Sequence, residues 1–169
     1  MVKMRLNIRD FYGVYARTGG DDFTSIIDSV PASYDLNLIP FLRIKGQEWP
    51  HLPGLRVIAP PKRTARGREN DHLIVYLSLA GNSPFPTQDY EALISTLVER
   101  FYQSPGAVTS GLRLGADSVN QSLMERNMRT TGKGQYLLGR LILGVLRKNQ
   151  LLIARCGPVH VYQLSSGKV

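Results

Sequence analysis

Apolar residues are densest near the end of the chain, in three runs at residues 136–146, 151–156 and 159–164. A polar stretch at residues 147–150 separates the first two runs, and a glycine–proline pair separates the second from the third. Two nearly continuous apolar runs joined by a short polar turn are typical of a β-hairpin that is buried on at least one face. We therefore expect three consecutive strands here, together with a large share of the hydrophobic core.

Shorter apolar patterns upstream predict further strands, at residues 39–44, 55–59 and 72–80. The last of these alternates, and by the period-2 rule its leucine and valine positions share one face of a strand. These positions are Leu73, Val75, Leu77 and Leu79. The region before residue 55 is broken repeatedly by proline, and within it residues 22–30 suit a short helix.

Between residues 87 and 129 the apolar spacing changes to the period of a helix. Residues 87–102 follow the i, i+3, i+4 pattern of an amphipathic helix, and we expect Thr87 to be its N-cap. A second helix is predicted at residues 107–129. Gly111 and Gly115 lie on or beside its apolar stripe, so a close approach of the two helices is expected.

The resulting order from residue 55 is strand, strand, helix, helix, and then three strands. This order predicts an α+β fold in which two long antiparallel helices pack on a mostly antiparallel sheet. We expect residues 1–54 to be an N-terminal extension and residues 55–169 to be the main domain. Because a strand that ends near Val169 should be followed by a returning strand, we also expect a longer parent chain and an incomplete sheet edge.

Charge and cysteine content narrow the classes of function. The chain has 169 residues, a formal net charge of +8 and a pI of about 9.9. The positive charge is spread along the whole chain, which favours acidic partners but argues only weakly for nucleic acid. Cys156 is the single cysteine, so one chain cannot form a disulfide framework or a cysteine metal cluster. A lone cysteine suits a reducing compartment, and we expect a cytoplasmic protein. No apolar run approaches the roughly 20 residues that span a bilayer.

The order of elements over residues 55–169 resembles the N-terminal portion of the PPM (PP2C-type) metal-dependent serine/threonine phosphatases. In that family a first strand carries an R-x-x-N-x-D type motif and the next an aspartate–glycine motif. Two long helices follow, and then a hairpin whose second strand ends in Gly-Asp-Ser-Arg. The resemblance implies a degenerate, truncated, bacterial member with an incomplete α-β-β-α sandwich. An active member would use Mn²⁺ or Mg²⁺.

The motif residues of that family are mostly absent from this chain. The sequence Arg68-Glu69-Asn70-Asp71 looks like a compressed first motif, which makes Arg68 a candidate phosphate ligand and Asp71 a candidate metal ligand. Ser78 or Ala80 stands where the resemblance places the second-motif aspartate, and Gly157-Pro158-Val159-His160 replaces Gly-Asp-Ser-Arg. A two-metal phosphatase site needs several converging carboxylates. We therefore assign no catalytic residue.

The favoured hypothesis is a non-catalytic PPM-like domain that acts as a binding or regulatory module and needs no cofactor. Its expected partner is another protein or another domain of the parent chain, with no nucleic acid and no membrane span. One alternative is a fragment of an active metal-dependent protein serine/threonine phosphatase, whose missing ligands come from further sequence. A second alternative is a basic domain that binds polyanions, which predicts binding that weakens steeply with salt.

Overall fold

The computed structural model describes residues 3–6, 12–15, 39–44, 46–49, 54–147 and 150–164. The chain forms two compact units, of which one is Pro53–Pro158 and the other combines Met1–Leu52 with Val159–Val169. We expected residues 55–169 to lie together, whereas the segment after Pro158 belongs with the beginning of the chain. The helix expected at residues 22–30 falls outside the described residues.

The first unit contains a five-stranded antiparallel sheet with the order β4-β3-β2-β1-β9. The strand predicted at residues 39–44 is confirmed as β3. The five strands of this sheet are β1 (Lys3–Leu6), β2 (Tyr12–Tyr15), β3 (Ile39–Ile44), β4 (Gln47–Trp49) and β9 (Tyr162–Leu164).

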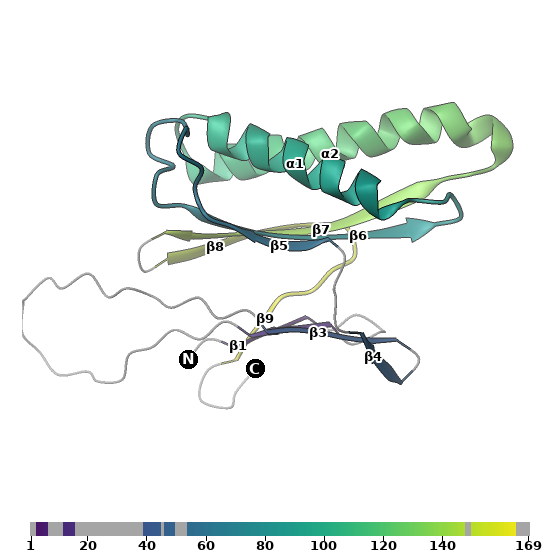
Figure 1. Cartoon of the computed structure of the whole chain (residues 1–169), viewed down its shortest axis with the longest axis horizontal. Coiled ribbons are helices and arrows are strands. Elements are labelled where there is room, and N and C mark those ends of the chain that lie inside the picture. Colours follow the sequence, from purple (N-terminus) through teal and green to yellow (C-terminus); the bar gives the residue numbers. More distant parts are fainter. Residues whose placement is uncertain are drawn as a thin grey trace, which may run out of the picture. The chain divides into compact units, whose positions relative to one another are not determined.

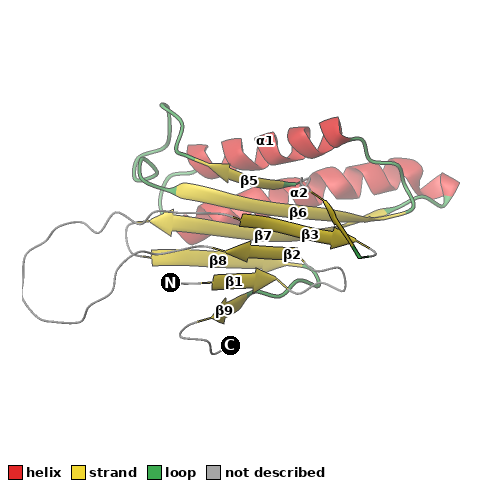
Figure 2. Ribbon diagram, turned by 60° about the horizontal axis from the view of Figure 1, so that its bottom comes forward, coloured by secondary structure: helices red, strands yellow, loops and turns green. Residues whose placement is uncertain are grey.

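The second unit is a four-stranded antiparallel sheet with the order β5-β6-β7-β8 and two helices (Figure 2). Both helices cover the same face of this sheet (Figure 1). This arrangement confirms the α+β class and the helix pair on an antiparallel sheet. The elements are β5 (Leu55–Ile58), β6 (His72–Gly81), α1 (Thr87–Gln103), α2 (Val108–Thr130), the short 3-10 helix η1 (Thr131–Lys133), β7 (Leu137–Arg147) and β8 (Gln150–Cys156).

The predicted hairpin is confirmed as β7 and β8, which pair from Arg147 opposite Gln150 to Leu141 opposite Cys156. The third predicted strand is shorter than expected and lies in the other sheet, because Tyr162–Leu164 pairs with β1. Gly157, with a φ of 84°, and the proline after it turn the chain away from β8. Our expectation of three consecutive strands in one sheet was therefore wrong for the third.

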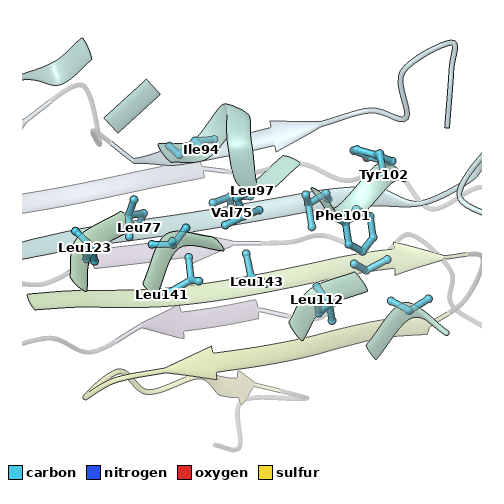
Figure 3. Packing of buried hydrophobic residues seen from close by; sticks show 14 of the residues in the cluster. Val75, Leu77, Ile94, Leu97, Phe101, Tyr102, Leu112, Leu123, Leu141 and Leu143 are labelled. Carbon is cyan, nitrogen blue, oxygen red and sulfur yellow. The ribbon is translucent and has the colours of Figure 1, made fainter. Parts of the chain in front are cut away.

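The core of the second unit lies between the sheet and the helices (Figure 3). The alternating face of β6 is confirmed, because Leu73, Val75 and Leu77 have no solvent exposure and Leu79 packs against them. Burying a large aliphatic or aromatic side chain contributes about 1.5–3 kcal/mol. The core residues from the other elements include Ile94, Leu97, Phe101, Leu112, Val119, Leu123, Leu141 and Leu143.

Each end of the two helices lies within one residue of its predicted position. The predicted N-cap at Thr87 was wrong: Thr87 is the first helical residue, and extended Pro86 precedes it without a side-chain cap. Proline is favourable at this boundary because its φ is fixed near the helical value and it has no backbone N–H that the start of a helix would leave unpaired. The close helix approach is confirmed, since a Cβ at Gly115 would lie 3.3 Å from Leu97 Cγ of α1. Among the described helices, none has the length and apolar composition that crossing a membrane requires.

Candidate functional site

The two site residues predicted from the sequence, Arg68 and Asp71, lie just before β6 and have no solvent exposure. Arg68 Nη1 donates to Asp71 Oδ2 at 3.3 Å. Arg147, at the end of β7, donates from Nε to Oδ1 at 2.5 Å and from Nη2 to Oδ2 at 2.7 Å. A planar guanidinium that meets both carboxylate oxygens in this way is among the strongest side-chain pairings. We call Arg68, Asp71 and Arg147 the arginine–aspartate network.

The remaining donors of Arg68 bind the connection between the helices. Its Nε donates to the carbonyl oxygen of Ser104 at 3.1 Å, and Nη2 donates to that of Ala107 at 2.8 Å. The guanidinium carbon also lies 4.8 Å from the centre of the Phe101 ring. Ser104 is the C-cap of α1, where the helix dipole favours a cation. Arg68 therefore joins the loop before β6 to the end of one helix and the start of the next.

Tyr102 closes the network from α1. Its hydroxyl oxygen lies 2.6 Å from the carbonyl oxygen of Asp71 and 2.9 Å from that of Ile58. Burial raises the pKa of Tyr102 to about 12, and the negative charge of Asp71 adds to this effect. The hydrogen bond to Asp71 raises the pKa of Arg147 above its ordinary value. Both shifts favour the neutral phenol and the charged guanidinium, which are the forms that hold the network together.

The surroundings of Asp71 do not fit a divalent metal site. Both carboxylate oxygens already accept hydrogen bonds from guanidinium groups, so a metal ion would have to displace Arg147. The neighbouring Glu69 is exposed, and the backbone hydrogen bonds around it lower its pKa. Within the part of the chain that the structure describes, no three His, Cys, Asp or Glu side chains come together. The geometry supports a structural role for Arg68 and Asp71, and their ligand roles stay predictions.

A pocket of about 550 Å³ lies at the other end of the β6–β7 pair. Ala80 is nine positions after Asp71 along an extended strand, which corresponds to a distance of about 30 Å. The pocket is formed by the end of β6, the start of β7, one stripe of α2 and the turn after β8. We call it the apolar groove. It is lined by Ala80, Asn120, Leu123, Met124, Asn127, Met128, Thr131, Leu137, Leu138, Gly139, Arg140, Gly157 and Pro158.

The apolar groove brings together two segments at which the family resemblance would place metal aspartates. Ala80, one of the two residues considered for the first position, lines the groove, whereas Ser78, the other, does not. Gly157 and Pro158, at the second position, also line it. The described lining contains no Asp, Glu, His or Cys side chain. The structure therefore joins these two predicted positions, but Arg68 and Asp71 lie far from them.

The groove exists because β7 extends beyond β8. The last pair between these strands is Leu141 opposite Cys156, so residues 137–140 have no partner in β8. Asn127 of α2 pairs with the first residue of β7: its Nδ2 donates to the Leu137 carbonyl, and its Oδ1 accepts from the Leu137 N–H, both at 2.8 Å. A side-chain amide thus supplies the donor and the acceptor that a neighbouring strand would have supplied.

Sequence reasoning missed the contribution of α2 to this groove. Its lining stripe includes Asn120, Leu123, Met124, Asn127, Met128 and Thr131. The signal was present, because Met124 and Met128 are four residues apart and share one helix face. The prediction followed the core stripe instead, which ends at Leu123, a residue that both stripes share.

Comparisons with known protein families, characterised proteins and solved structures found no match to this chain.

Proposed function

We propose that this chain is a non-catalytic domain of the PPM phosphatase type, which acts as a binding or regulatory module. In this proposal the apolar groove corresponds to the metal centre of active members, and its metal-binding carboxylates have been replaced. The sheet with two helices on one face would be part of the larger sandwich of that family. The domain would contribute a surface for a partner, not a reaction.

The observation that carries the proposal is the chemistry of the apolar groove. Mn²⁺ and Mg²⁺ bind mainly to carboxylate and other oxygen ligands, and two-metal hydrolysis needs several of them. The groove instead has Ala80, Gly157 and Pro158 at the expected aspartate positions, next to leucine and methionine side chains. The one carboxylate that resembles a family motif, Asp71, is used in the arginine–aspartate network.

The first test is calorimetric titration of the chain with Mn²⁺, together with a phosphatase assay on p-nitrophenyl phosphate and a phosphothreonine peptide. We expect no saturable heat up to millimolar metal and no turnover above the buffer control. Metal-dependent turnover that scales with protein concentration would contradict the proposal and support the fragment of an active phosphatase. If binding is seen, the titration is repeated on Asp71→Asn to ask whether Asp71 is a ligand.

A gain-of-binding experiment tests the family resemblance itself. The double variant Ala80→Asp, Pro158→Asp places two carboxylates in the groove where the resemblance expects them. We expect it to gain Mn²⁺ binding that the parent chain lacks, and the matched variant Ala80→Asn, Pro158→Asn should bind at least about tenfold more weakly, a difference of about 1.4 kcal/mol. If the folded aspartate variant binds no metal, the correspondence between the groove and the family's metal centre is wrong.

A further inference from the structure

Large apolar side chains that are exposed to solvent gather at the apolar groove. Met124 is 49% exposed, Met128 67% and Leu138 61%, and all three line the groove. Tyr136, which is 49% exposed, directly precedes β7 and the lining residue Leu137. Scattered exposed apolar residues are ordinary on a protein surface, but a cluster of them marks an interaction site.

The lining suits a ligand with varied apolar groups. Methionine is unbranched and polarisable, so Met124 and Met128 can adjust to side chains of different shape. The volume of about 550 Å³ lies within the range of roughly 300–1,000 Å³ that is usual for ligand pockets. Gly139 lets α2 approach β7 closely here, since a Cβ would lie 2.7 Å from Leu123 Cδ1. The floor of the groove is therefore packed, while its walls are adaptable.

Arg140 gives the groove a charge preference. Among the described residues that line the groove, Arg140 alone is charged. It is half-buried, and no side-chain hydrogen bond or ion pair joins its guanidinium group to another residue in the described part of the chain. A guanidinium beside apolar walls binds a carboxylate more strongly than it would in open water, because the local dielectric is lower. The net charge of +8 acts in the same direction over longer distances.

We propose that the apolar groove binds an acidic peptide segment of a partner protein. Gly139 faces α2, so the neighbouring side chains of Leu138 and Arg140 lie on the opposite face of β7, and the segment would cross the edge of the strand that β8 leaves unpaired. Its large apolar side chains would pack against Met124 and Met128 on one side of this edge and Leu138 on the other, and a carboxylate would pair with Arg140. This inference rests on the proposed binding function and specifies the chemistry of the partner. Groove recognition of this kind uses a few apolar anchors for affinity and charge for selectivity.

The test uses three fluorescein-labelled synthetic peptides of about 12 residues and fluorescence anisotropy. The first contains glutamate with leucine and phenylalanine, the second has lysine in place of glutamate, and the third has serine in place of the apolar residues. We expect micromolar binding of the first peptide and at least tenfold weaker binding of the other two. The serine peptide controls for general attraction between an acidic peptide and a basic protein.

Two variants of one helix locate the binding surface. Met124 and Leu114 are both on α2 and both 49% exposed, but only Met124 lines the groove. Met124→Glu should weaken binding at least tenfold, whereas Leu114→Glu should leave it within about twofold. Arg140→Glu should reverse the preference, so that the lysine peptide binds more tightly than the glutamate peptide. Circular dichroism and a thermal melt establish that each variant is folded.

Several outcomes would overturn the inference. These are no binding of the acidic peptide up to a millimolar concentration, equal binding of the glutamate and lysine peptides, and equal binding by Met124→Glu and the parent chain. Met124-dependent binding of dodecanoate without peptide binding would show that the groove takes a small amphiphile instead. Failure of the proposed function is seen separately, as metal-dependent phosphatase turnover.

Discussion

The two ends of the β6–β7 pair differ in how their polar and apolar groups are used. At one end, Arg68 and Asp71 are fully buried, and with Arg147 they form hydrogen bonds to one another and to nearby carbonyl groups. At the other end, Met128 and Leu138 are largely exposed, and the described residues offer Arg140 no ion pair. The β6–β7 pair thus has buried, hydrogen-bonded charged residues at one end and exposed apolar residues at the other.

This difference separates residues that hold the fold together from residues that are available to a ligand. A buried polar group is stable only if it is hydrogen-bonded, so a fully paired network is evidence of a structural role. An exposed apolar cluster contributes little to stability, and such a cluster is typical of an interaction site. By this criterion the hydrogen bonds of Arg68 and Asp71 support a structural role, while their ligand roles stay predictions. The residues that looked like ordinary helix and strand positions form the candidate site.

The largest loss of stability is expected when the Asp71 carboxylate is removed from the arginine–aspartate network. Asp71→Ala leaves the charge of Arg68 buried without its partner, which should lower the free energy of unfolding by about 3–5 kcal/mol. Urea denaturation measures the change. The matched control is Asp117→Ala, which breaks the exposed ion pair with Arg113 and should cost less than about 1 kcal/mol. Equal losses of unfolding free energy for the two variants would contradict a structural role of the network.

The dependence of stability on high pH tests the contribution of Tyr102, which lies beside the arginine–aspartate network. Because the pKa of Tyr102 is raised to about 12 in the folded chain, compared with about 10 for a free phenol, its stabilising effect is fully present below pH 10. The effect is lost as the pH rises from 10 through 12, with an expected loss of about 2 kcal/mol. Urea denaturation of the parent chain and of Tyr102→Phe over this pH range gives the contribution of Tyr102 as the difference between the two curves. A difference that is independent of pH would contradict the assignment.

A smaller effect is expected from filling the space beside Arg68. A Cβ at Gly111 would lie 2.7 Å from Arg68 Nη2, whose position is fixed by Ala107 and Asp71. Gly111→Ala should therefore destabilise the chain by about 1–2 kcal/mol, although glycine to alanine inside a helix ordinarily stabilises by up to about 1 kcal/mol. Thermal denaturation is compared with that of Gly132→Ala, which has open space around the added Cβ. Stabilisation by Gly111→Ala would show that Arg68 moves aside freely.

Substitutions of the exposed apolar residues at the groove should hardly change the free energy of unfolding. Met128→Ser and Leu138→Thr remove apolar groups that are 67% and 61% exposed, so unfolding free energies should change by less than about 0.5 kcal/mol. Binding of the acidic peptide should nevertheless fall for both variants. A large loss of stability from either substitution would place its side chain in the core and remove the contrast between the two ends.

Local patterns were enough to predict the elements of the second unit. The alternation from Leu73 to Leu79 identified the buried face of β6, and the helical spacing identified α1 and α2 almost to the residue. The start of α1 was misassigned because Thr87 is a good capping residue by type, whereas the chain uses Pro86. Such errors are small, because helix ends depend on one or two residues.

Contacts between distant residues could not be predicted in this way. The strand at Tyr162–Leu164 pairs with β1 at the opposite end of the sequence, and no local pattern shows to which of the two sheets it belongs. Arg147 is 76 residues from Asp71, so the hydrogen bonds between them were not visible in the sequence. The groove depends on sheet register, which places Ala80 beside the turn after β8.

The amide of Asn127 has a consequence for self-association. A strand that extends beyond its neighbour presents unpaired N–H and C=O groups, and strands of other molecules can pair with such edges. By occupying both groups of Leu137, Asn127 protects this segment of β7 from adding a foreign strand. Replacing Asn127 with leucine would keep the bulk of the side chain while uncovering the edge. Aggregation and amyloid-type dye binding, more than a lower melting temperature, would then be the expected sign of its loss.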